Sequence, residues 1–173
     1  NTPVIATVFY LTVALISMVM YNKANTNYNS TTEKINSLTS FMYFYKLLQF
    51  STLTACIFSF WSNSPILFKV FVNNEFLIYL GISLSGLSIS LFAAARFSLG
   101  KNYSPCYDSY MPKDINTTGI YSFVRHPIYT SNILLMLGIF ISSSSMIVLI
   151  NAIVLLVYYY MSAVREENAI IGK

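Results

Sequence analysis

The chain has 173 residues, of which 55% are hydrophobic and only 9% are charged, with a net charge of +4 and a mean hydropathy of +0.60. A soluble domain carries about 25% charged residues, so a soluble fold would leave long apolar runs of this chain exposed to water. The composition therefore predicts an integral membrane protein. The small positive charge does not indicate nucleic acid, because cytoplasmic loops of membrane proteins carry such an excess. The single histidine argues against a His/Cys metal cluster.

A helix that crosses the hydrocarbon core needs about 20 apolar residues. The first 97 residues contain three such runs, at residues 3–21, 41–61 and 76–97. Pro3 suits the first turn of the first helix, and a polar connector at residues 22–40 precedes the second. Lys46 lies about one turn inside the second run. We expect its side chain to snorkel towards the membrane surface, and a functional intramembrane lysine is the less favoured interpretation.

The third run is rich in small residues. Gly81 and Ser85 are four residues apart, as are Gly86 and Ser90, so each pair shares one helix face. Small residues at this spacing let the backbones of membrane helices approach closely. We expect this surface to pack on a neighbouring helix rather than to contact a cofactor.

A long polar loop at residues 99–124 follows, and two further apolar runs occupy residues 127–141 and 146–164. One helix through both runs would be about 57 Å long at 1.5 Å per residue, nearly twice the thickness of the membrane core. A hairpin that turns at the four serines at 142–145 is therefore the better prediction. The expected fold is an all-α membrane bundle of about five transmembrane helices in one domain, residues 1–173, whose last two helices form a hairpin.

The distribution of positive charge predicts the orientation of this bundle. With five spans, eight lysines and arginines fall on one side and only Lys69 falls on the other. The eight are Lys23, Lys34, Arg96, Lys101, Lys113, Arg125, Arg165 and Lys173. We therefore expect the N-terminus outside the cell and the C-terminus in the cytoplasm.

Two polar clusters flank the predicted hairpin. Arg125 and His126 precede its first helix, and Arg165, Glu166 and Glu167 follow its second. If the chain folds back at about position 143.5, Arg125 lies level with residue 162 and Glu166 lies level with residue 121. The hairpin thus predicts that both clusters meet at one cytoplasmic end.

Each cluster also has a purely structural interpretation. Arg125 and His126 would anchor a helix to lipid headgroups, and Arg125 and Arg165 would neutralise the two glutamates. However, carboxylates at a helix C-terminus oppose the macrodipole by up to about 1 kcal/mol each, and they face a leaflet that is usually anionic. A bound cationic group would relieve both costs. An arginine, free backbone N–H groups and two carboxylates at one site suit a zwitterionic ligand.

The motif Gly119-x-Tyr121-x-x-x-Arg125-His126-Pro127-x-Tyr129, a helical hairpin, and then Arg165-Glu166-Glu167 resembles the isoprenylcysteine carboxyl methyltransferase family. That family shares a membrane superfamily with the phospholipid N-methyltransferases. The segment at residues 99–104 is also similar, and the resemblance covers about residues 96–168. It implies an enzyme that binds S-adenosylmethionine at the cytoplasmic end. Members usually continue past the glutamate pair with an amphipathic segment that closes the site, and since this sequence ends at Lys173, we expect that segment to be absent or not included.

The resemblance also implies roles for individual residues. The positions that match its cofactor site are Gly119, Tyr121, Arg125, His126, Tyr129, Glu166 and Glu167. Arg125 and Glu167 are the expected catalytic residues, because Arg125 would orient a carboxylate while the glutamates hold amino or ribose groups of the cofactor.

The expected partners are membrane lipids and a lipophilic or prenylated acceptor, with the carboxyl of an isoprenylcysteine as the leading choice. The alternative is an amine-directed phospholipid methyltransferase, which would need His126 as a general base. A sterol reductase relative that uses NADPH, and a membrane scaffold without enzymatic activity, are less favoured.

Overall fold

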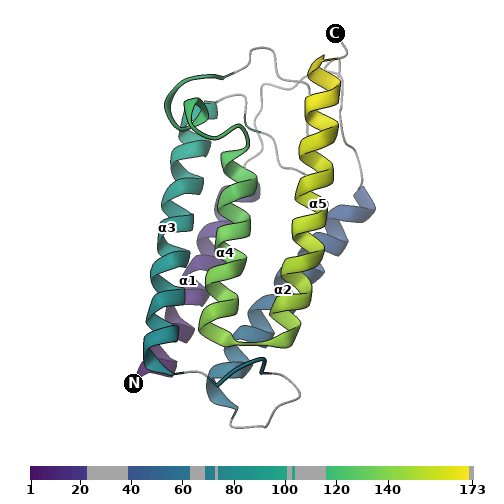
Figure 1. Cartoon of the computed structure of the whole chain (residues 1–173). Coiled ribbons are helices and arrows are strands. Elements are labelled where there is room, and N and C mark those ends of the chain that lie inside the picture. Colours follow the sequence, from purple (N-terminus) through teal and green to yellow (C-terminus); the bar gives the residue numbers. More distant parts are fainter. Residues whose placement is uncertain (23–38, 63–68, 73, 101–102, 104–115, 172–173) are drawn as a thin grey trace.

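A computed structural model places the chain as a bundle of long helices that run roughly alongside one another (Figure 1). It describes residues 1–22, 39–62, 69–72, 74–100, 103 and 116–171. The five α-helices are α1 (Thr2–Asn22), α2 (Thr39–Trp61), α3 (Glu75–Leu99), α4 (Pro127–Ser143) and α5 (Met146–Ile171). A short 3₁₀ helix, η2 (Gly119–Ser122), precedes α4. The predicted all-α membrane bundle is confirmed.

Three of these helices are both long enough and apolar enough to cross a membrane, namely α1, α3 and α5. Of the other two helices, α4 is apolar but has only 17 residues. Helix α2 is long enough, but Lys46, Gln49 and several hydroxyl side chains lower its hydropathy. The bundle therefore combines three strongly apolar helices with one short and one more polar helix.

Helix ends follow from local sequence signals. The side chain of Asn74 accepts a hydrogen bond from the backbone N–H of Leu77 at 2.9 Å and so caps the start of α3. Pro127 occupies the first turn of α4, where its missing N–H costs nothing. Ser144 ends α4 in the left-handed conformation, with φ of 54°, and its N–H bonds to the carbonyl of Phe140 at 2.7 Å. This residue forms the predicted serine turn of the hairpin.

The first of the two predicted small-residue pairs on α3, Gly81 and Ser85, packs against α4. A Cβ atom added to Gly81 would meet the backbone oxygen of Gly138 and would come within 2.6 Å of the Ser142 nitrogen. The reverse also holds, because a Cβ at Gly138 would lie 2.9 Å from the nitrogen of Ser85. By contrast, a Cβ added to Gly86 would meet no atom within 4 Å, so no close helix contact requires a glycine there.

Buried hydroxyl and amide groups link the helices in pairs. The Tyr10 hydroxyl of α1 lies 2.7 Å from the Ser142 hydroxyl of α4. The Asn151 amide of α5 donates to the hydroxyls of Ser51 and Thr52 on α2, at 2.8 and 2.9 Å. Bonds of this kind each stabilise membrane bundles by about 0.6 kcal/mol on average. They tie α1 to α4 and α2 to α5.

The last helix extends beyond its apolar run. The run stops at residue 164, and α5 continues through the charged triplet to Ile171. Arginine and glutamate are good helix formers, so they extend the helix beyond its apolar part. Glu166 and Glu167 consequently lie inside the last two turns, and the predicted conflict with the C-terminal dipole is weaker than we assumed.

Candidate functional site

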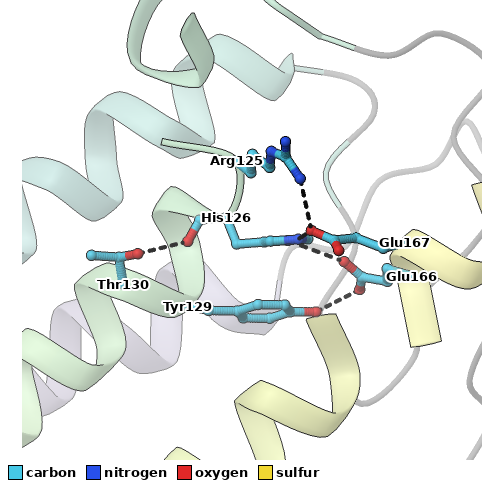
Figure 2. A network of polar contacts seen from close by, with 6 residues as sticks. All are labelled: Arg125, His126, Tyr129, Thr130, Glu166 and Glu167. Atoms are coloured by element: carbon cyan, nitrogen blue, oxygen red, sulfur yellow. Dashed lines mark hydrogen bonds and ion pairs between the residues drawn. The ribbon is translucent and has the colours of Figure 1, made fainter. Parts of the chain in front are cut away.

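The two polar clusters meet where α4 begins and α5 approaches its end (Figures 1 and 2). His126 lies between the two carboxylates. Its Nε2 atom is 3.1 Å from Glu167 Oε1, and its Nδ1 atom is 3.7 Å from Glu166 Oε2. The Tyr129 hydroxyl donates a hydrogen bond to Glu166 Oε1. The predicted convergence is therefore present in the structure.

Aromatic stacking extends this cluster into the bundle. The imidazole of His126 stacks on the ring of Tyr129, with centroids 5.5 Å apart and planes 14° apart. Tyr129 in turn stacks on Tyr159 of α5, at 5.4 Å and 20°. The Tyr159 hydroxyl lies 3.0 Å from that of Tyr45 on α2. A continuous series of rings thus joins the carboxylates to the centre of the bundle.

The stack also accounts for the register of the hairpin. A fold at position 143.5 places Tyr129 level with residue 158, and its ring contacts the neighbouring Tyr159. Glu166 lies two turns farther along α5, yet it reaches Tyr129. Helical side chains tilt towards the N-terminus of their own helix. The glutamates therefore point back along α5 while Tyr129 points towards the start of α4, and the two meet.

Arg125 contributes less to this cluster than the sequence predicted. Its Nη1 atom lies 3.9 Å from Glu167 Oε1, at the limit of an ion pair, and its side chain is 87% exposed. His126 is the closer partner of both carboxylates, with its side chain 25% exposed. The guanidinium is thus available to a ligand, whereas the imidazole is already engaged. Figure 2 shows Arg125 above the plane of these contacts.

Gly119 and Tyr121 lie in η2, next to the cluster. Gly119 has a φ of 61°, a conformation that favours glycine, and an added Cβ would come within 3.2 Å of the Ser98 hydroxyl. Burial, and secondly the charge of Glu166, raise the pKa of Tyr121, so its hydroxyl stays neutral beside that carboxylate. Of the predicted loop at residues 99–124, residues 101–102 and 104–115 lie outside the described part of the chain.

Sequence reasoning missed two neighbours of the cluster, Tyr159 and Ser162. Ser162 lies one turn before Glu166 on the same face of α5, since residues four apart are neighbours on a helix. Its hydroxyl is buried and has no hydrogen-bond partner in the part of the chain that the structure describes. Both residues could have been found from the sequence, because Ser162 and Tyr159 lie four and seven residues before Glu166 and therefore share its face of the helix.

The hairpin and its polar cluster have a counterpart among known proteins. The sequence model of the phospholipid methyltransferase family matches residues 76–173, which is more than half of the chain. The chain belongs to this family. The match includes α3, η2, α4 and α5 and therefore every residue of the cluster, whereas α1 and α2 lie outside it. Neither the curated proteins nor the solved structures contain a match to the chain.

Membership of the phospholipid methyltransferase family makes this chain a membrane methyltransferase. The superfamily is the one that the motifs at residues 119–129 and 165–167 suggested. The three apolar helices agree with an integral membrane protein that acts on lipophilic substrates.

Proposed function

We propose that the polar cluster binds S-adenosylmethionine and that the chain transfers its methyl group to the carboxyl of an isoprenylcysteine or a similar lipophilic acid. The observation that carries this proposal is the juxtaposition of an exposed guanidinium with two carboxylates at one end of a membrane bundle. This donor set fits the amino-acid part of the methyl donor. Arg125 would hold its carboxylate, because guanidinium groups bind carboxylates in a bidentate manner.

The glutamates supply the complementary half of such a site. Glu167 is 42% exposed, so one of its oxygens can accept hydrogen bonds from an ammonium or ribose hydroxyl group. Glu166 is more enclosed, with 24% exposure, and Tyr129 fixes its orientation. We propose that Glu167 is the direct ligand and that Glu166 sets the negative charge beside it. Gly119 and Tyr121 shape the adjoining wall in η2.

The chemistry requires positioning more than acid–base catalysis. S-adenosylmethionine would supply a methyl group that is bound to a positively charged sulfur. An acceptor oxygen attacks the methyl carbon in line with the carbon–sulfur bond, and the sulfur leaves as a neutral thioether. A carboxylate acceptor is already anionic near neutral pH and needs no base. The residues of the chain therefore have to orient the two reactants and exclude water.

The contacts of His126 support a carboxyl rather than an amine acceptor. A phospholipid amine must lose a proton, and His126 is the only histidine available to take it. Its Nε2 atom is within hydrogen-bond distance of Glu167 Oε1, at 3.1 Å, and its Nδ1 atom lies 3.7 Å from Glu166 Oε2. An amine acceptor would have to displace one of these carboxylates to reach a ring nitrogen. The phospholipid amine remains the alternative to be tested.

The proposed site faces the cytoplasm. Arg96, Arg125 and Arg165 lie towards the end of the bundle that holds the polar cluster, while Lys69 pairs with Ser145 at the hairpin turn. This asymmetry supports a cytoplasmic cluster under the positive-inside rule. The N-terminus, at the opposite end in Figure 1, would then lie outside.

Calorimetric titration of the purified protein with S-adenosylhomocysteine tests the proposal. Arg125→Ala and Glu167→Gln should each weaken binding by at least about tenfold, because hydrogen bonds to charged groups contribute about 1.5–3 kcal/mol. Arg125→Ala should also abolish methyl transfer while the protein still folds. Arg165→Ala and Glu75→Gln are matched controls, since neither residue belongs to the proposed site. Unchanged affinity in both test variants would remove the site.

A second assay identifies the acceptor. Labelled methyl donor is supplied with N-acetyl-S-farnesylcysteine in one sample and with phosphatidylethanolamine vesicles in another. Transfer to the first, in a form that mild base releases, indicates a methyl ester and supports the proposal. Base-stable label on the phospholipid indicates N-methylation and establishes the alternative instead.

A further inference from the structure

A second feature of the bundle lies outside the polar cluster. A cavity of about 390 Å³ opens between α1, α2 and α4, and most of its lining is apolar. Cavities of this size accommodate small ligands in other proteins. Cys56, Tyr10 and Ile139 are buried at one end of this cavity, while Lys46 and Met18 line the other end.

The residues that line the cavity follow the length of the helices. Along α2 it extends from Lys46 to Cys56, ten residues or about 15 Å at 1.5 Å per residue. That length is about half the thickness of the hydrocarbon core of a bilayer. A single extended hydrocarbon chain matches this length and lining better than a compact polar molecule does.

A chain of contacts connects the cavity wall to the polar cluster. Tyr45 lines the cavity, and its hydroxyl is 3.0 Å from that of Tyr159. Tyr159 stacks on Tyr129, whose hydroxyl bonds to Glu166. Two aromatic rings therefore separate the cavity wall from the carboxylates. A chain held in this cavity would present its head on the side of the bundle where the cluster lies.

Lys46 gives the cavity its chemical selectivity. It lies seven residues, or about 10 Å, from the start of α2. Its side chain is exposed, has no acidic partner within the described residues, and lines a cavity whose other walls are largely apolar. Ionisable groups on the helices of a membrane bundle are uncommon and usually mark a ligand path. A carboxylate at the head of the bound chain would neutralise it.

We infer that this cavity between α1, α2 and α4 binds the hydrocarbon chain of a lipophilic carboxylic acid, with Lys46 as the residue that binds its carboxylate. The inference rests on the proposed function for the choice of a carboxylate, but it names a separate part of the molecule. Transfer from lipid into an apolar cavity gains little hydrophobic free energy. The cavity would therefore position the acceptor, while Lys46 would discriminate between acids and neutral lipids.

Photolabelling tests the inference without requiring methyl transfer. The intact protein is irradiated with palmitic acid that carries a diazirine in mid-chain, and separately with the corresponding alcohol. The acid should label the segments of α1, α2 and α4 that line the cavity. Leu53→Trp, which fills the cavity, should reduce labelling there by both probes about tenfold. Leu47→Trp should not, because Leu47 is 63% exposed and lies outside the cavity lining.

Lys46 variants test the head of the site. Lys46→Met should reduce labelling by the acid about tenfold and leave labelling by the alcohol unchanged. Lys46→Arg should retain labelling by the acid. Equal labelling of Leu53→Trp and the unaltered protein would overturn the cavity as a site. If Lys46→Met reduces labelling by both probes equally, or if a diazirine phosphatidylethanolamine labels the cavity preferentially, Lys46 does not bind a carboxylate there. Because labelling needs no methyl donor, failure here is distinct from failure to bind S-adenosylhomocysteine.

Discussion

The contact between α3 and α4 makes a prediction in which two glycine-to-alanine changes have opposite signs. Gly138→Ala places a Cβ against the Ser85 hydroxyl, 2.8 Å from the Gly81 oxygen and 2.9 Å from the Ser85 nitrogen. The last two are backbone atoms, so the helices must move apart. Overpacking of this kind costs about 1–3 kcal/mol. Gly86→Ala meets nothing within 4 Å and removes a glycine from a helix interior, which gains up to about 1 kcal/mol.

Thermal unfolding in one detergent compares the two variants directly. For a chain of this length, 1 kcal/mol shifts Tm by about 2–4 °C, so Gly138→Ala should lower Tm by several degrees and Gly86→Ala should leave it unchanged or raise it. The first variant should also bind S-adenosylhomocysteine less tightly, because α4 carries His126 and Tyr129. If Gly138→Ala is as stable as Gly86→Ala, the close helix contact is not present as described.

Two further predictions concern hydrogen bonds. Tyr129→Phe keeps the ring stack but removes the donor to Glu166; it should weaken S-adenosylhomocysteine binding about tenfold by calorimetry, given about 1.5–3 kcal/mol for a bond to a charged group. Tyr160→Phe, on the exposed face of α5, should have no effect, and equal affinities in the two variants would contradict the role of Tyr129. Asn151→Leu removes both amide bonds to α2 and should lower the free energy of unfolding by about 1 kcal/mol. An unchanged midpoint in detergent-based unfolding would show that these bonds do not hold α2 to α5.

The hairpin could be predicted because membrane thickness limits helix length. Once the two apolar runs were too long for one span, the serines at 142–145 were the natural turn, and Tyr129 had to lie near residue 158. The small-residue face at Gly81 was predictable for a similar reason, because close backbone contact needs a missing side chain. Both inferences used only distances along one or two helices.

The remaining features depend on how separate helices assemble. The pairing of Tyr45 with Tyr159 requires the position of α2 relative to α5, which no periodicity in either helix specifies. The same holds for the cavity that Lys46 lines, because it forms between three helices. That the Lys46 side chain extends towards the membrane surface stays a prediction. His126 was expected to contact a ligand or headgroups, but its place between both glutamates depends on the tilt of side chains on two antiparallel helices.

The polar cluster and the cavity are formed by different parts of the chain. All residues of the polar cluster lie within the segment that matches the phospholipid methyltransferase family, whereas α1 and α2 provide most of the cavity wall and lie outside that segment. Methyl transfer makes similar demands for every acceptor, since it requires orientation and exclusion of water. Acceptor choice depends instead on the shape and charge of the space that holds the chain. The two helices outside the family match are therefore where we expect acceptor specificity to be determined, with Lys46 as its first test.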